Sequence, residues 1–411
     1  MPTKVLGPVS SEERIPLLDA LRGFTLCGIL VMNIRLFSGF AYALDISPDA
    51  VGRFGPGTGE VEFLTKLLFD GKFYSIFSFL FGLGFSVQLL RSEGKPEWLK
   101  LYARRLCILF LFGVIHAYAL WYGDVLRFYA LLGFILLLFR NKQPKAILGW
   151  ALAFLLIPIP LYAACYFVAP GFDTNQLVPN ALDLKTVVHL YATESYPVIL
   201  RVNFEDDIFW EIFQLFTGHL FKYLGMFLLG LWAGRVQVLH QPEQHRTLYK
   251  RVLWAGLVLG LLAGIVHATA SWKINPFSPE GIYWSVAYAL AVHPLSLAYI
   301  AGFVLLWQRD TGQQLLARFA AMGRMALTNY LMQTMLAVGI YYGYGLGWFG
   351  RMPILITMLL VVPSILLVQM IASTWWMRHF RYGPAEWVWR QATYRRRLPL
   401  RIERLSGASA R

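Results

Sequence analysis

Long apolar stretches alternate with short polar segments along most of the chain. About ten of these stretches approach the roughly 20 residues that an α-helix needs to cross a bilayer. Within hydrocarbon every backbone N–H has to bond inside its own segment, so each stretch is predicted to be a helix. The predicted helices cover residues 15–37, 64–90, 104–121, 125–140, 146–169, 208–234, 250–271, 282–307, 325–343 and 353–377.

The composition agrees with lipid as the solvent of this chain. Of its 411 residues, 57% are hydrophobic and only 15% are charged, and the mean hydropathy is +0.52. Soluble domains rarely combine these values. The fold class is therefore predicted to be all-α, a polytopic bundle of membrane-spanning helices.

The formal charge of +14 lies in short runs between the apolar stretches, which indicates membrane topology rather than a nucleic-acid partner. Basic residues follow the second, fourth and sixth predicted helices, whereas the intervening connectors are richer in carboxylates. Because Lys and Arg concentrate in cytoplasmic loops, both termini are predicted to be cytoplasmic.

Four segments follow from this pattern. They are an N-terminal membrane half (1–170), an extracytoplasmic loop (171–207), a C-terminal membrane half (208–377) and a basic cytoplasmic tail (378–411). The loop is long for a connector, and a surface helix is expected around 184–191; the loop is either a lid over an outward-facing pocket or simply exposed.

Two glycine-containing segments, FLFGLGF (79–85) and FLLGLWAG (227–234), share small residues rather than a true repeat. Small residues allow membrane helices to pack closely, so close packing is their expected role. The three cysteines lack the spacing of a disulfide framework or a zinc site, and no metal is predicted.

Charged side chains inside the predicted helices are the strongest functional signal, because each costs at least about 2.5–3.5 kcal/mol in the bilayer. In the first helix Asp19 and Arg22 are three residues apart and are expected to pair. Asn33 follows three turns later on the same face, roughly 16 Å farther along. This polar stripe either lines a functional cavity or contains a purely structural Asp–Arg pair.

Further polar groups are expected near the outer surface. The second helix opens with Asp70 and Lys72, and the turn after the third helix carries Trp121 and Asp124. His116 lies about five residues before this turn, roughly 8 Å deep. A histidine transfers protons near neutral pH when a carboxylate orients its ring. The alternative is a hydrogen-bonded core histidine without a catalytic role.

In the sixth predicted helix, Glu211, Gln214 and Lys222 fall on one face, with Lys222 near mid-membrane. The ninth helix carries Asn329 and Gln333 at i and i+4. These side chains either line the same cavity as a substrate pocket or form hydrogen bonds between helices.

Four motifs resemble the YeiB family of bacterial membrane proteins, whose C-terminal part is a domain of unknown function. They are LDALRGFTLCGILVMNI (18–34), GVIHAYALWYGDVL (113–126), GRMALTNYLMQT (323–334) and RHFRYGPAEWVWRQAT (378–393). The resemblance covers nearly the whole chain and implies a multi-pass protein of the bacterial inner membrane.

The LDxLRG opening also resembles the transmembrane acyltransferase superfamily, mainly in the first helix. Bacterial O-acyltransferases of that superfamily have a histidine eleven residues after the motif arginine, where this chain has Asn33. The pattern of the glucosaminide acetyltransferase has an asparagine there and a reactive histidine just before the second helix, where this chain has none.

The leading hypothesis from the sequence is transfer of an acyl group, most simply acetyl, from cytoplasmic acyl-CoA to an extracytoplasmic hydroxyl or amine. The acceptor is a small molecule, a glycan or a lipid. Arg22, Arg104 and Arg105 at the inner helix ends are expected to hold the CoA phosphates.

In the same hypothesis His116 is the general base and Asp124 orients it, while Asn33 and Lys72 stabilise the oxyanion. Asp19, Asp70 and Trp121 are expected in the substrate pocket with the polar residues of the sixth and ninth helices. A proton-coupled transporter or lipid flippase remains an alternative, although the sequence reveals neither an inverted repeat nor a pair of broken helices. A non-catalytic scaffold or sensor and a homo-oligomer also remain open.

Overall fold

A computed structural model describes residues 14–46, 52–91, 97–172, 183–239, 241–269 and 275–402. Throughout these ranges the regular structure is helical, and no strand is formed. Six helical segments are long and apolar enough to cross a membrane; they are Pro16–Phe37, Thr58–Arg91, Pro144–Val168, Pro242–Thr269, Pro279–Trp307 and Ile354–His379. The chain is therefore a helical membrane bundle.

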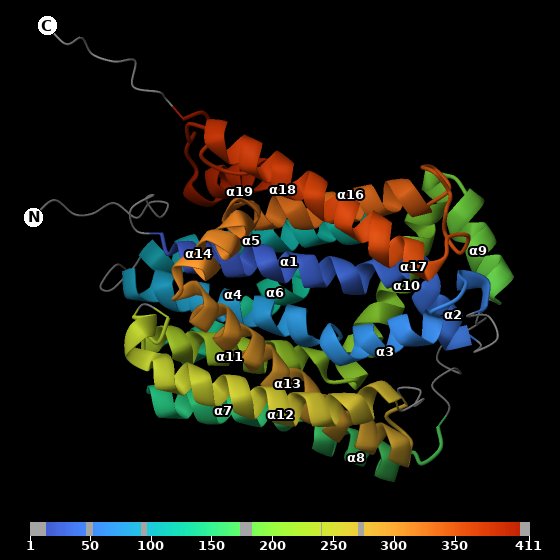
Figure 1. The fold of residues 1–411 in the computed structure, drawn as a ribbon, viewed down its shortest axis with the longest axis horizontal. Helices are drawn as coiled ribbons and strands as arrows, with labels where there is room; N and C mark the ends of the chain where they lie inside the picture. The colour runs from blue at the N-terminus through green and yellow to red at the C-terminus, as the bar shows by residue number, and fades with distance from the viewer. Residues whose placement is uncertain are drawn as a thin grey trace, which may run out of the picture.

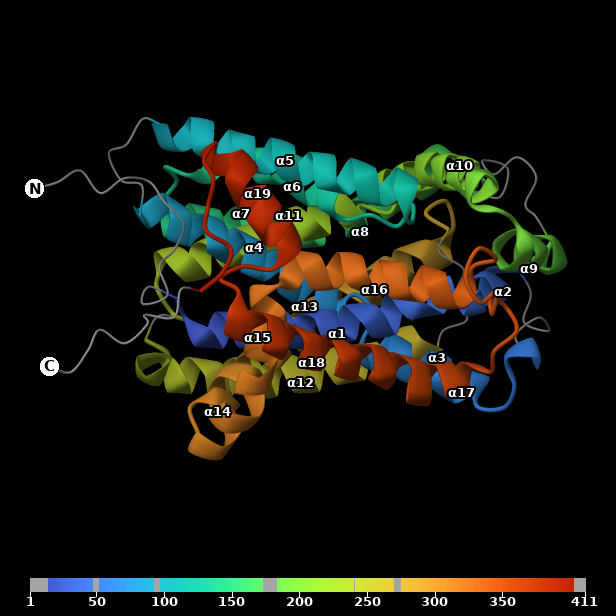
Figure 2. The same ribbon diagram turned by 90° about the horizontal axis from the view of Figure 1, so that it is seen from above.

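Most helices run along the long axis of the molecule (Figure 1). In chain order these helices are α1 (Pro16–Phe37), α3 (Thr58–Leu68), α4 (Lys72–Arg91), α5 (Glu97–Ala119), α6 (Leu126–Leu136), α7 (Pro144–Leu156), α8 (Pro158–Val168), α10 (Tyr196–Phe216), α11 (His219–Arg235), α12 (Arg246–Thr269), α13 (Pro279–Trp307), α16 (Ala326–Tyr341), α17 (Ile354–Ile356) and α18 (Val362–His379). The shorter helices are α2 (Phe40–Ile46), α9 (Leu184–Thr193), α14 (Asp310–Leu316), α15 (Ala320–Arg324) and α19 (Pro384–Tyr394). The start of α1 lies at the same end of the bundle as α19, whereas α2 and α9 lie at the opposite end (Figure 2).

Two predicted helices are interrupted near the α2 end of the bundle. The segment 64–90 divides into α3 and α4 at Gly71, which has φ +76°. The prediction of one helix over 208–234 is wrong, because α10 begins at Tyr196 and Gly218, with φ +67°, separates it from α11. Glycine adopts these left-handed angles without the steric cost that other residues incur.

The C-terminal segment is not a free tail up to residue 402. The helix α19 packs against α5 and α16, and Phe380 forms an isolated antiparallel bridge with Arg401. Residues 403–411 of the predicted tail lie outside the described ranges. The expected surface helix is confirmed as α9, in which the Tyr191 hydroxyl donates a 2.5 Å hydrogen bond to Asp206 of α10.

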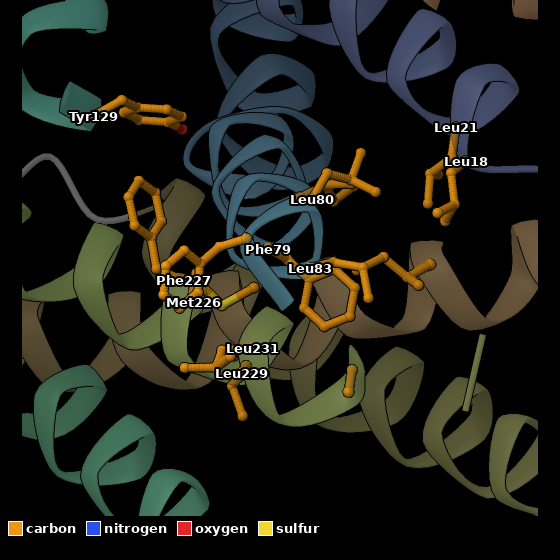
Figure 3. Packing of buried hydrophobic residues seen from close by; sticks show 14 of the residues in the cluster. Leu18, Leu21, Phe79, Leu80, Leu83, Tyr129, Met226, Phe227, Leu229 and Leu231 are labelled. Atoms are coloured by element: carbon orange, nitrogen blue, oxygen red, sulfur yellow. The ribbon is translucent and has the colours of Figure 1, made fainter. Parts of the chain in front are cut away.

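The centre of the bundle depends on a close contact between α4 and α11 (Figure 3). A Cβ atom at Gly82 would lie 1.8 Å from the Phe227 carbonyl oxygen, and one at Gly230 would lie 1.9 Å from that of Phe79. The two glycine-containing segments noted in the sequence therefore pack against each other, which confirms their expected role.

We expect Gly82→Ala to lower the unfolding midpoint, because its methyl group would separate the two backbones at a cost of about 1–3 kcal/mol. Gly84→Ala is the matched control on the same helix, since a Cβ there has no neighbour within 4 Å. Thermal unfolding in detergent compares the two variants. Equal midpoints for both would contradict the proposed close contact.

Asp206, at the α9 end of the bundle, is expected to make the stability of the folded protein depend on pH. Burial raises the pKa of its carboxyl to about 6, although the hydrogen bond from Tyr191 opposes this shift. The folded protein therefore holds this proton more tightly than the unfolded chain, whose aspartates titrate near pH ~3.9. The resulting stabilisation is complete below about pH 4 and is lost as the pH rises through about 6.

We therefore expect the protein to lose stability relative to Asp206→Asn as the pH rises from about 4 to about 7, by at most about 3 kcal/mol. Unfolding midpoints measured for both proteins across this range provide the test. A difference that stays constant with pH would show that Asp206 titrates normally.

Candidate functional site

A large cavity with a volume of about 1290 Å³ runs beside α1. The lining residues of this helix extend from Leu18 to Leu36, which corresponds to roughly 27 Å at helical rise. The cavity therefore connects the α19 end of the bundle with the end near α2. This length agrees with the polar stripe predicted from Asp19, Arg22 and Asn33, all of which line it.

Arginines surround the α19 end of the cavity. We call the following lining residues the arginine cluster: Arg14, Arg22, Arg105, Arg324, Arg381 and Arg390. Arg22 pairs with Asp19 at 2.9 Å, whereas the Nε atom of Arg324 has no hydrogen-bond partner among the described residues. The positive charge at this end exceeds the negative charge that the neighbouring carboxylates supply.

Glu386 of α19 lines the same end of the cavity but already has its own partners. One carboxylate oxygen accepts hydrogen bonds from the Leu327 and Thr328 amides at 2.7 and 3.1 Å, and the other accepts from the Thr328 hydroxyl at 2.5 Å. These amides belong to the first turn of α16, which favours a negative charge. Burial nevertheless raises the pKa of Glu386. Glu386 thus attaches α19 to the bundle; it forms no ion pair with the arginine cluster among the described residues, although its charge acts on Arg390.

At the other end, Asn33, Asp70, Trp121, Asp124 and His219 line the cavity. They come from α1, the α3–α4 break, the turn after α5 and the start of α11. The α10–α11 break at Gly218 exposes the first turn of α11 to the cavity. The place of His219 in the cavity wall was not predicted, because a continuous helix was expected over 208–234.

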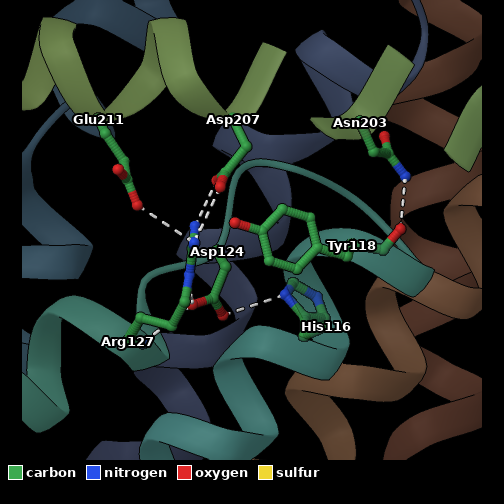
Figure 4. Close-up of polar contacts among 7 residues, drawn as sticks. All are labelled: His116, Tyr118, Asp124, Arg127, Asn203, Asp207 and Glu211. Carbon is green, nitrogen blue, oxygen red and sulfur yellow. Dashed lines mark hydrogen bonds and ion pairs between the residues drawn. The ribbon is translucent and has the colours of Figure 1, made fainter. Parts of the chain in front are cut away.

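His116 and Asp124 form the predicted pair, with Nδ1 3.1 Å from the carboxylate oxygen (Figure 4). The imidazole is completely buried and is absent from the cavity lining, whereas Asp124 faces the cavity. Its Nε2 atom lies 2.9 Å from the Thr334 hydroxyl. The pairing is confirmed, but a general-base role for His116 would require Nε2 to exchange Thr334 for a substrate.

Arg127 holds Asp124 from the opposite side and was missed in the sequence, although it stands inside an apolar run. Its backbone N–H and Nε donate to Asp124 at 2.9 and 3.3 Å, and its guanidinium forms a two-pronged ion pair with Asp207 (Figure 4). Glu211 lies 3.3 Å from the same guanidinium and is half exposed. Contrary to the prediction, Glu211 does not line the cavity.

The two lysines predicted for the site do not line the cavity either. The Lys72 ammonium donates to the Lys66 carbonyl at 2.7 Å, so it is not directed at Asn33. The Lys222 ammonium lies 4.0 and 5.0 Å from the ring centres of Tyr288 and Trp284 and has no hydrogen-bond partner among the described residues. Ring faces attract cations, so they stabilise this buried charge.

Asn329 and Gln333 form hydrogen bonds between helices, as the alternative interpretation proposed. Asn329 donates to the Ser373 hydroxyl at 2.9 Å and Gln333 donates to the Gln369 side chain at 3.1 Å, both on α18. Arg104 donates to the Thr393 carbonyl at 2.9 Å. These three predicted site residues do not line the cavity.

Eight residues predicted for the site therefore share the cavity: Asp19, Arg22, Asn33, Asp70, Arg105, Trp121, Asp124 and Gln214. Asp70 also contacts a histidine, with its oxygen 3.2 Å from Nε2 of His267. No cluster of His, Cys, Asp or Glu suited to a metal ion occurs within the described residues.

The family model and the relatives that match this chain point to the same family. Residues 233–396 match the family described as protein of unknown function (DUF418). The chain is 36% identical over 409 residues to "Uncharacterized protein YxaH" of Bacillus subtilis (strain 168), covering 95% of this chain and 96% of that protein. It is 27% identical over 387 residues to "Uncharacterized protein YeiB" of Escherichia coli (strain K12), covering 93% and 97%. No solved structure matches the chain. The chain belongs to the YeiB family, as its four motifs predicted.

Proposed function

We propose that this protein is a transmembrane acyltransferase of the bacterial inner membrane. It would move an acyl group, most simply acetyl, from cytoplasmic acyl-CoA to an extracytoplasmic hydroxyl or amine. The observation that carries this proposal is the continuous cavity that joins the arginine cluster to Asn33, Asp124 and His219. A donor and an acceptor that enter from opposite sides of a membrane need such a connection.

The proposal includes about ten transmembrane helices with both termini in the cytoplasm. In this orientation the arginine cluster faces the cytoplasm, in agreement with the concentration of Lys and Arg in cytoplasmic segments. The end of the cavity near Asn33 then faces outward, where the acceptor would bind.

The inner part of the cavity fits the chemistry of acyl-CoA. Ordinary small-molecule pockets have volumes of about 300–1,000 Å³, so about 1290 Å³ is sufficient for an extended donor. Guanidinium groups bind phosphates through paired, charge-assisted hydrogen bonds. Arg22 and Arg105 remain suited to this role, whereas Arg104 is bonded to the Thr393 carbonyl instead.

In the proposed reaction the acceptor oxygen or nitrogen attacks the thioester carbonyl carbon, and the carbon–sulfur bond breaks. His219 accepts the acceptor proton and returns it to the leaving thiolate, so the products are the acylated acceptor and free CoA. The Asn33 amide donates a hydrogen bond to the developing oxyanion. Asp124 orients the acceptor, while His116 acts as a positioning residue that holds Asp124.

A second function, a proton-coupled transporter or lipid flippase, is favoured by the breaks at Gly71 and Gly218. Transporters commonly form their binding sites from discontinuous helices. Gly71 and His219, which directly follows Gly218, both line the cavity. These breaks were not predicted, so the argument from sequence against a transporter is weaker than expected.

Labelled acetyl-CoA supplied to inverted inner-membrane vesicles tests acyl transfer. We expect label in material inside the vesicles, and a loss of about 10²–10⁴-fold for His219→Gln because the general base is removed. His116→Gln should reduce the rate less. His189→Gln is the matched control, since this side chain is exposed on α9.

Labelling that does not depend on the protein, or that is unchanged in His219→Gln, would contradict this mechanism. Substrate-dependent proton flux in liposomes without acyl turnover would instead favour the transporter.

A further inference from the structure

The C-terminal helix α19 forms one wall of the cavity at the arginine cluster. Trp389, Arg390, Thr393 and Tyr394 all line the cavity from this helix. Its position is fixed against α5, because the Trp389 indole donates to the Arg105 carbonyl at 2.9 Å. The Arg105 guanidinium in turn lies 4.3 Å from the centre of the Trp389 ring. This contact joins Arg105 on α5 to α19, the helix that carries Arg390.

Among the described residues no ion pair joins the arginines at this wall to a carboxylate except Arg22–Asp19, although Asp19 and Glu386 lie near enough to act on Arg324 and Arg390 through their charge. Arg390 lies over the Tyr382 ring at 4.8 Å, and neither Arg390 nor Arg105 forms an ion pair among the described residues. The Nε atom of Arg324, on α15, is buried without a hydrogen-bond partner. The two acids at this end are already engaged, Asp19 with Arg22 and Glu386 with the start of α16.

Several cations around one cavity repel one another, and Arg105, Arg324 and Arg390 lose hydration without forming an ion pair among the described residues. A ligand with clustered negative charges would supply the paired counter-charges that these arginines lack. Phosphate groups match guanidinium geometry particularly well, because each guanidinium donates two parallel hydrogen bonds. The aromatic rings beside the arginines add flat surfaces that suit an attached planar group.

We infer that α19 completes a binding site for a ligand with clustered phosphate groups, held by Arg390 together with Arg105 and Arg324. Under the proposed function, on which this assignment of the ligand rests, these phosphates belong to the CoA part of the donor. The headgroup of an anionic phospholipid offers the same chemistry from a second source. In either case the site is incomplete without the C-terminal helix.

Binding of free CoA to the full-length protein in nanodiscs of neutral lipid tests the site without requiring catalysis. Arg390→Gln should weaken binding by about tenfold to a hundredfold, the loss expected for charge-assisted hydrogen bonds of about 1.5–3 kcal/mol. Arg397→Gln is the matched control, because this exposed arginine follows the same helix and does not line the cavity. It should bind CoA as the unmodified protein does.

Arg324→Gln serves as a second variant, because it removes a guanidinium of the site without altering α19. Unfolding midpoints of the variants establish that the helix and bundle remain folded. Pyrophosphate should compete with CoA, and dephospho-CoA, which lacks one phosphate, should bind more weakly. Unchanged CoA affinity in both folded variants would overturn the inference.

The same measurements distinguish a failure of the proposed phosphate site from a failure of the proposed acyl transfer. If anionic phospholipid is retained by the protein but lost in Arg390→Gln, while CoA does not bind, the phosphate site stands and the acyl-CoA donor is excluded. If acyl transfer occurs and neither arginine variant changes CoA or lipid binding, the proposed function stands and the site at α19 is wrong.

Discussion

Each charged side chain within this bundle needs a counter-charge, an aromatic ring or a water-accessible cavity, and this requirement organises the structure. Arg127 satisfies it with Asp124 and Asp207, and Lys222 with the rings of Tyr288 and Trp284. The arginine cluster is different, because all six of its arginines line the cavity while only Arg22 forms an ion pair among the described residues; Arg105 and Arg390 contact aromatic rings instead. The positive charge without paired carboxylates therefore marks the region where an anionic ligand is needed.

The sequence predicted the helices well where apolar length alone decides the outcome. The boundaries of α1, α12, α13 and the segment Ile354–His379 lie close to those expected from the hydrophobic pattern. It did not predict the breaks at Gly71 and Gly218, because glycines also occur inside uninterrupted helices such as α4. The turn at Gly218 places Glu211 on α10 and Lys222 on α11. The two side chains therefore do not share one helix face, although the sequence had predicted that they would.

Polar residues could be identified from the sequence, but the direction of their side chains could not. Asn33 and Asp124 face the cavity, whereas His116 lies behind Asp124 and bonds Thr334 on a distant segment. That contact depends on tertiary packing and leaves no local sequence signal. Likewise, the basic composition of the C-terminal segment suggested a tail, although Glu386 and Trp389 attach it to α16 and α5.

Structure determination of the protein with acetyl-CoA tests the central claim, that one cavity serves both sides of the membrane. We expect density for the nucleotide phosphates beside Arg105, Arg324 and Arg390, with the thioester extending toward Asn33 and Asp124. A cavity divided into closed compartments, or one filled by membrane lipid while acetyl-CoA remains unbound, would contradict it.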